Sequence, residues 1–226
     1  MNERRIELKA GPLRADWVNG ELRYVRCGAV EVLRRVYVAV RDCHWGTVPL
    51  RISNPEFEMG KDEFRLSFVA THQQDEIDFR WQGTITGDAQ GAITFTMDGA
   101  AQRDFLRNRI GLCVLHPLEC AGQPCRIEHA DGAIEDGRFP QFIAPHQPFK
   151  DIRAITHESV TVRLTGDVFE MEDQRNWTDG SFKTYSTPLA LPYPVMVQAG
   201  ERIVQEMQLH VVPASAGMPL PASYSD

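Results

Sequence analysis

The densest group of chemically capable side chains lies in residues 166–188, GDVFEMEDQRNWTDGSFKTYSTP. Carboxylates, cations, a phenol, an indole and an amide follow one another there. Glu170 and Glu172 stand two residues apart, which is about 6.6 Å along an extended strand. Carboxyl pairs near this separation serve general acid and base hydrolysis of sugars. The pair therefore indicates acid–base chemistry.

Four residues are the candidates for catalysis. Hydrolysis needs a base that activates water, and Glu172, Glu170 or His146 could supply it. His146 lies in a Pro-His-Gln-Pro loop that holds its side chain in place. A cation must stabilise the developing oxyanion, and Lys183 is the candidate, with Arg175 as a second choice.

A further set of polar and aromatic residues could bind a substrate. The alternative is a surface network in which Arg175 and Lys183 pair with the two glutamates and Trp177 anchors a loop. Arg107 and Arg109 are expected to lie on the surface or pin a loop, rather than to act on a substrate. The substrate-binding candidates are Arg175, Asn176, Trp177, Asp179, Tyr185 and His116.

A β-hairpin is expected to position these side chains. Residues 167–171 and 181–186 read as its strands, and Asp179-Gly180 reads as a turn because glycine accepts positive φ. Strand side chains alternate between faces, so Glu170 and Glu172 should share one face. Lys183 and Tyr185 should share a face of the return strand. If the two polar faces coincide, the four groups converge.

The rest of the chain predicts an all-β fold with very little helix. Short alternating runs follow one another, and Asn19-Gly20 reads as a type I′ turn between strands 14–18 and 21–25. Around fifteen strands exceed an immunoglobulin domain, so a large antiparallel supersandwich of the galactose-mutarotase type is the better fit. We expect one domain over residues 1–212 and a disordered tail over 213–226. The other expected strands are 30–40, 51–55, 57–59, 63–72, 77–86, 92–98, 110–115, 125–129, 152–155, 159–165, 195–197 and 202–212. A helix over 32–41 and a connector over 51–55 are the alternatives, whereas 139–149 is a proline-rich loop or edge segment and 100–109 a helical turn or bulge.

Composition narrows the class of protein. The net charge of −7 and the lack of a basic block argue against nucleic-acid binding. The sequence has neither a run long enough to span a bilayer nor an apolar leader, so no membrane partner and a cytoplasmic location are expected. Five cysteines, an odd number, fit reduced thiols. Their spacing and the absence of a metal-binding motif predict no metal and no cofactor.

Long segments of the sequence resemble the N-terminal part of D-apionate lactonases. They are FLRNRIGLCVLHP (105–117), FPQFIAPHQPFKDIRAI (139–155) and FEMEDQRNWTDGSFKTYSTPLALP (169–192), with a further similarity at 30–49. The resemblance implies a hydrolase that opens the lactone of a branched sugar acid in apiose catabolism. It also implies a β-sandwich at the front of a multidomain enzyme, whose barrel domain would be a partner.

Three functions remain open at this point. The chain could hydrolyse a sugar-acid lactone itself, with the sugar acid or its lactone as the small-molecule partner. It could be a non-catalytic sugar-binding or structural sandwich that packs against a catalytic barrel. The supersandwich also fits an aldose-epimerase-like enzyme, in which a His/Glu pair acts at a sugar C1.

Overall fold

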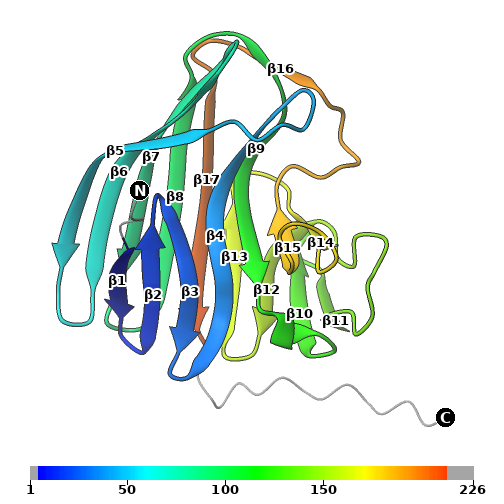
Figure 1. Cartoon of the computed structure of the whole chain (residues 1–226). Helices are drawn as coiled ribbons and strands as arrows, with labels where there is room; N and C mark the ends of the chain where they lie inside the picture. The colour runs from blue at the N-terminus through cyan, green and yellow to red at the C-terminus, as the bar shows by residue number, and fades with distance from the viewer. Residues whose placement is uncertain (1–4, 213–226) are drawn as a thin grey trace.

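Strands make up most of the structure, and within residues 5–212 seventeen of them build two antiparallel sheets packed face to face (Figure 1). The computed structural model describes residues 5–212. In order of pairing, the eight-stranded sheet contains β1 (Arg5–Ala10), β2 (Leu13–Val18), β3 (Glu21–Cys27), β4 (Val30–Asp42), β9 (Phe105–His116), β15 (Phe182–Tyr185) and β14 (Glu170–Asp173), and β16 (Val195–Val197) pairs with β9. The nine-stranded sheet contains β11 (Ile134–Arg138), β10 (Pro124–His129), β12 (Ile152–His157), β13 (Val160–Thr165), β17 (Arg202–Val211), β8 (Ala92–Ala101), β7 (Ile77–Gly87), β6 (Phe64–Gln74) and β5 (Leu50–Met59).

The core lies between the two sheets and follows from the period-2 pattern. In β6, β7 and β8 every second side chain is buried, because alternate residues of a strand point to the same face. The buried aromatic residues contact one another, and the ring centroids of Phe68 and Trp81 lie 5.4 Å apart. The alternation therefore supplies one apolar face per sheet, which is what a sandwich needs.

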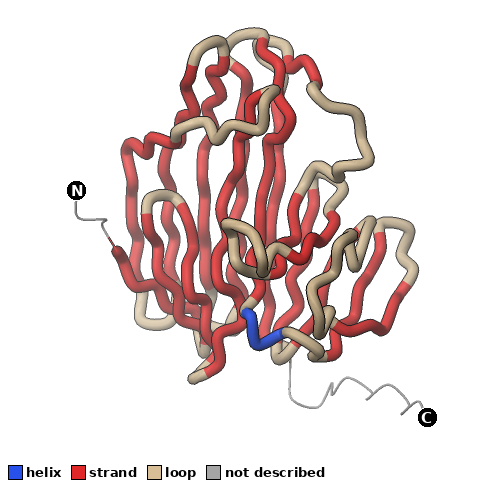
Figure 2. Tube along the Cα trace, turned by 45° about the vertical axis from the view of Figure 1, so that its right-hand side comes forward, coloured by secondary structure: helices blue, strands red, loops and turns tan. Residues whose placement is uncertain are grey.

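The predicted all-β class is confirmed. The one helical segment in residues 5–212 is a single 3₁₀ turn at Leu118–Cys120, drawn in blue in Figure 2. The predicted turn at Asn19-Gly20 joins β2 to β3, and both residues have positive φ, 48° and 85°. Two positive φ values are the signature of the type I′ hairpin turn.

Several boundaries differ from the sequence-based expectation. Residues 51–55 and 57–59 form one strand, β5, whose pairing with β6 shifts register between Ser53 and Glu56. Residues 100–109 contain no helical turn; β8 ends and β9 begins there, and the register of β9 with β4 shifts between Arg109 and Arg107, which fits the predicted alternative of a bulge. β11 was not predicted, because its sequence, IEDGR, is polar and almost wholly exposed at the sheet edge. Residues 139–149 form a loop, as their prolines predicted.

Two other expectations can be compared with residues 5–212 only in part. No helix among residues 5–212 has the length and apolar character needed to cross a membrane. The predicted tail at 213–226 lies outside the described residues. All five cysteines lie inside the described part of the chain, and none forms a disulfide there.

Candidate functional site

The predicted hairpin exists, with slightly different bounds. β14 and β15 pair antiparallel, with Glu170 opposite Tyr185 and Glu172 opposite Lys183. Two tight turns close the loop between the strands, the second by a bond from the Gly180 amide to the Trp177 carbonyl oxygen at 3.0 Å. Gly180 has a φ of 56°, which explains the need for glycine at this turn.

Alternation divides the hairpin as predicted. Met171 and Phe182 belong to the core between the sheets. Glu170, Glu172 and Tyr185 share the opposite face, because Tyr185 contacts both carboxylates. The polar groups therefore lie on the outer face of the eight-stranded sheet, near the hairpin labelled in Figure 1.

Tyr185 links the two glutamates. Its Oη lies 2.6 Å from Glu170 Oε1 and 2.7 Å from Glu172 Oε1. A phenol has one proton, so it donates to one carboxylate at a time and the two contacts share it. Burial, followed by the two carboxylates, raises the pKa of Tyr185 far above its usual range, so the phenol stays a hydrogen-bond donor.

Further donors hold the two carboxylates in place. The Leu189 amide donates to Glu170 Oε1 at 2.8 Å, and Gln174 Nε2 donates to Glu172 Oε2 at 2.6 Å. Glu170 is buried, whereas Glu172 is half-buried. Of the predicted carboxyl pair, Glu172 is therefore the member that a ligand can reach, and Glu170 supports Tyr185 from below.

A second pair lies beside the first. Lys183 Nζ donates to Asp179 Oδ2 at 2.8 Å, and Tyr37 Oη donates to the same oxygen at 3.3 Å. Lys183 is 4% exposed, so its ammonium is largely removed from water. The cross-strand pairing of Lys183 with Glu172 brings this ion pair next to the glutamates. The alternative network, in which Arg175 and Lys183 pair with the glutamates, does not form.

These groups line a cavity of about 990 Å³. Its wall comes from residues 143–147, from the hairpin at 172–183, from β4 and β9, and from Leu189 and Tyr193. Such a volume is in the range of small-molecule sites, which bury a ligand against a few fixed polar groups. Six of the ten predicted site residues line it: His146, Glu172, Asn176, Trp177, Asp179 and Lys183.

The loop that carries His146 is fastened by an ion pair. Asp173 accepts hydrogen bonds from Nε and Nη2 of Arg175, at 2.9 and 2.7 Å, and from the Ala144 amide at 2.9 Å. Burial alone would raise the pKa of Asp173, but the hydrogen bonds from Arg175 and the two backbone amides outweigh it and lower the pKa. Arg175 also donates to the carbonyl oxygens of Pro140 and Gln141. The pair therefore positions residues 140–144.

Four of the ten predicted residues do not line the cavity: Glu170, Tyr185, Arg175 and His116. Glu170 and Tyr185 are buried, and Tyr185 contacts Glu172, which does line it. Arg175 is engaged by Asp173 and by the loop carbonyl groups, as described above. His116 is fully buried between the sheets, where its Nε2 lies 2.9 Å from Thr184 Oγ1 and its Nδ1 lies 3.1 Å from His157 Nε2. Burial lowers the pKa of His116 well below its usual value, with a smaller effect from His157.

Sequence reasoning missed several residues of the site. Arg41 and Arg109 line the cavity from β4 and β9, and Trp45 and Tyr193 contact each other at 5.1 Å between ring centroids. Arg109 was expected on the surface or pinning a loop; it is buried, and its Nη2 lies 3.5 Å from the Thr187 carbonyl oxygen of a loop. It reaches the cavity through the pairing of β4 with β9, which places it opposite Arg41 and which the local sequence does not report.

Metal binding has no counterpart among the described residues. Within 5–212, no three His, Cys, Asp or Glu side chains gather in a group that could hold a metal ion. The donors of the cavity are instead suited to hydroxyl and carboxylate groups. Carboxylates and Asn176 can accept from or donate to sugar hydroxyls, and a protonated Lys183 can stabilise a developing oxyanion.

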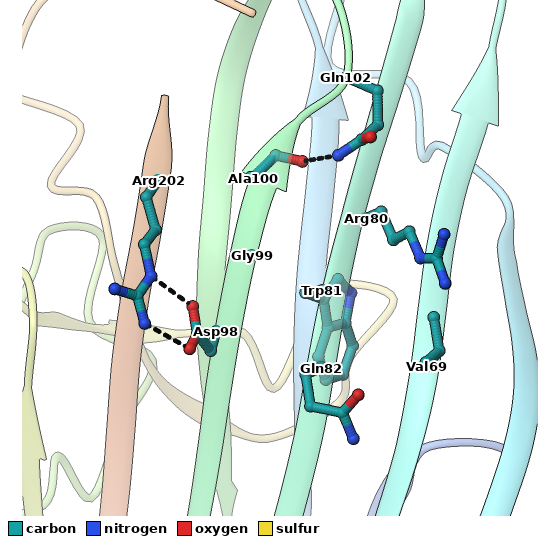
Figure 3. A pocket seen from close by; sticks show the side chains of 9 residues that line it. All are labelled: Val69, Arg80, Trp81, Gln82, Asp98, Gly99, Ala100, Gln102 and Arg202. Carbon is teal, nitrogen blue, oxygen red and sulfur yellow. Dashed lines mark hydrogen bonds and ion pairs between the residues drawn. The ribbon is translucent and has the colours of Figure 1, made fainter. Parts of the chain in front are cut away.

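A smaller depression of about 230 Å³ lies on the outer face of the nine-stranded sheet (Figure 3). Asp98 and Arg202 face each other there through two hydrogen bonds of 2.7 and 2.6 Å. The side-chain amide of Gln102 donates the hydrogen bond drawn to the Ala100 carbonyl oxygen, so a further donor is already engaged. This face carries no buried charged group and is the weaker candidate.

Comparison with solved structures agrees with the fold. A putative aldose 1-epimerase from Escherichia coli K12 is similar over 93% of this chain and 99% of its own, with a TM-score of 0.56 and 13% identity. A GalM/aldose epimerase homologue from C. elegans gives a TM-score of 0.55 at 11% identity, over 93% and 99% of the chains. At this identity the likeness concerns the fold alone, and it confirms the galactose-mutarotase-like supersandwich.

Comparison of sequences gives the family. The D-apionate lactonase of Brucella anthropi is 41% identical over 211 residues, which cover 90% of this chain and 35% of that protein. The chain thus spans about a third of the length of the curated relative it matches. The family described as "D-apionate lactonase, N-terminal domain" matches residues 1–214. The chain therefore belongs to the D-apionate lactonase family, in which it corresponds to the N-terminal domain.

Proposed function

We propose that this chain supplies a binding cavity for a sugar acid or its lactone in D-apionate lactonase chemistry. One observation carries the proposal: in a chain of this family, Glu172 lines a large cavity and is held there by Tyr185, which also contacts Glu170. The relative from Brucella anthropi is named for the reaction. Five cysteines without a disulfide support action in the cytoplasm.

Polyhydroxylated ligands suit this wall. Glu172 and Asp179 offer carboxylate oxygens to hydroxyl groups, and Asn176 offers both a donor and an acceptor. The ring of Trp177, which is 70% exposed, provides an apolar surface for the C–H face of a sugar. Each type of group that a small sugar acid presents thus meets a partner within one cavity.

Hydrolysis could use the same residues. Glu172 or His146 would accept a proton from water, and the water oxygen would bond to the lactone carbonyl carbon. The ring C–O bond would then break, and the protonated base would return its proton to the leaving ring oxygen, which becomes a hydroxyl group. Lys183 would stabilise the negative oxygen of the intermediate. Arg175, the other predicted cation, does not line the cavity and is not proposed for this role.

A second candidate function is docking on a catalytic domain. Trp177 and Ile143 line the cavity and are 70% and 46% exposed, and Phe142, the neighbour of Ile143 in the chain, is 85% exposed. Contiguous exposed apolar residues mark interaction sites. The family domain is N-terminal, and its relative extends well beyond it. A barrel domain packed on this rim would close the cavity, since ligand sites often lie between domains.

The test is lactone hydrolysis and ligand binding by the 226-residue chain. Calorimetry with sodium D-apionate should show binding to the wild type, and Glu172→Gln should weaken it at least tenfold. Glu58→Gln on the exposed edge strand β5 is the matched control and should bind like the wild type. Equal binding by wild type and Glu172→Gln, with no hydrolysis of D-apionolactone by either, would reject the cavity as the site.

The two candidates separate when a catalytic partner is supplied. If the chain only completes a site, hydrolysis should appear on adding the remaining domains of a D-apionate lactonase, and Phe142→Ala with Trp177→Ala should reduce that gain. Activity of the 226-residue chain alone would favour catalysis by its own residues. Interconversion of sugar anomers, followed by NMR, would instead indicate epimerase chemistry.

A further inference from the structure

Two arginines of the cavity stand directly opposite each other. Arg41 of β4 pairs in register with Arg109 of β9. Directly opposite residues of an antiparallel pair extend from the same face with their Cβ atoms about 4.5–5.5 Å apart. Both side chains line the 990 Å³ cavity, so two guanidinium groups approach it from adjacent strands.

Arg109 is buried without an acidic partner. It is 5% exposed, and its Cζ lies 3.9 Å from the ring centroid of Tyr185 and 5.4 Å from that of Trp45. Its Nη2 reaches only the Thr187 carbonyl oxygen, at 3.5 Å, and its buried Nε has no hydrogen-bond acceptor. The aromatic contacts cover faces of the guanidinium, whose N–H edge is the part that binds carboxylates in a fork.

Arg41 also has no acidic partner. Its Nη1 donates to Thr47 Oγ1, and within residues 5–212 no carboxylate forms an ion pair with Arg41 or with Arg109. Arg202 on the opposite side of the sandwich, by contrast, is held by Asp98 at 2.6 Å (Figure 3). The cavity therefore contains two cations that the described residues do not neutralise.

This arrangement is costly unless an anion binds. Like charges directly opposite each other in a sheet destabilise it, and an arginine cannot relieve the repulsion by losing its proton. Removing such a charge from water adds to the cost when no counter-charge replaces the water. A ligand carboxylate between the two guanidinium groups would remove both penalties.

We propose that Arg41 and Arg109 form an anion subsite that binds the carboxylate of an open hydroxy acid. Tyr185 lies between this subsite and the carboxylates, because its ring contacts Arg109 and its Oη contacts Glu172. The charged end of the ligand meets the arginines, and its hydroxyl groups meet Glu172 and Asp179. The assignment rests on the proposed function and narrows it: the cavity selects the acid, which is charged, over neutral sugars and lactones.

Calorimetry of the 226-residue chain with two probes tests the subsite. Sodium D-apionate carries the charge, and D-apiose is the neutral sugar of the same carbon skeleton. Wild type should bind apionate more tightly than apiose. Arg41→Met and Arg109→Met should weaken apionate about 10- to 100-fold, the range for loss of a desolvated charged contact, and change apiose less than twofold.

Two further variants keep the test decisive. Arg109→Lys retains the charge but not the fork, and it should weaken apionate severalfold even if Arg109→Met fails to fold. Arg80→Met, on the exposed face of the nine-stranded sheet, makes the same change of charge away from the cavity and should bind like the wild type (Figure 3).

Each other outcome overturns the proposal. Wild type that binds apiose as tightly as apionate, or variants that weaken both probes equally, would remove the subsite and leave the sugar-binding cavity in place. Wild type that binds neither probe would overturn the proposed function as well.

Discussion

Replacing Tyr185 with phenylalanine removes one oxygen atom from beneath the cavity and should destabilise the whole chain. Glu170, which is 2% exposed, would keep only the Leu189 amide as a donor. Hydrogen bonds to charged groups contribute about 1.5–3 kcal/mol each, and the two contacts of Tyr185 share one proton. We therefore expect Tyr185→Phe to lower the free energy of unfolding by ~2–4 kcal/mol.

Denaturant unfolding at pH 7.5, followed by tryptophan fluorescence, measures this loss. A chain of this length should also melt about 4–16 °C lower. Tyr37→Phe is the matched control: its hydroxyl lies 3.3 Å from Asp179, which keeps Lys183, so its cost should stay below ~1 kcal/mol. Adding Glu170→Gln to Tyr185→Phe should restore part of the loss, because a neutral side chain replaces the buried charge. A Tyr185→Phe variant within ~0.5 kcal/mol of wild type would refute the reasoning.

Three further changes test the surrounding structure. Burial lowers the pKa of His72 and of His157 to about 4, so these histidines bind protons in the unfolded chain before they do in the folded one, and stability falls as the pH drops from 6.5 to 4. Each histidine should lower the free energy of unfolding by ~2 kcal/mol at pH 5. Equal urea midpoints at pH 7.5 and 5 would contradict this. Asp173→Asn removes one partner of an ion pair whose carboxylate is fully buried and should lower the free energy of unfolding by ~3 kcal/mol. It should also make the loop at Ala144 more sensitive to proteolysis, and unchanged cleavage would contradict this. Trp177→Ala removes an exposed ring, so the unfolding free energy should change by less than ~0.5 kcal/mol while apionate binding weakens; a large loss of stability would show that the ring is structural.

The sequence predicts the hairpin of the site because its strands obey a simple period. Glu170 and Glu172 share a face for the same reason that Met171 and Phe182 share the core, and this follows from alternation alone. The strands start and end differently from the prediction, since Phe169 forms only an isolated bridge with Ile152. The side chains were therefore placed correctly although the strand limits were not.

Long-range pairing explains what the sequence could not predict. Arg109 reaches the cavity only because β9 pairs with β4, and no local pattern reports which strands become neighbours. His116 follows a continuous apolar run that is buried on both sides, so alternation does not assign it a face. Arg175 was a candidate because of its sequence neighbours, but its fork matches the carboxylate of Asp173 two residues away.

The fold and the family give different information about the reaction. The supersandwich alone is shared with a putative aldose 1-epimerase and an aldose epimerase homologue at 13% and 11% identity, which does not transfer a reaction. The family match gives the reaction of a relative of which this chain covers 35%. The charged groups of the cavity can be tested directly by substitution in this chain.

A crystal structure of the 226-residue chain soaked with sodium D-apionate tests the central claim most directly. We expect the ligand in the cavity on the outer face of the eight-stranded sheet, with its hydroxyl groups on Glu172 and its carboxylate on Arg41 and Arg109. An empty cavity at saturating apionate, or a ligand bound on the opposite face near Asp98, would contradict it.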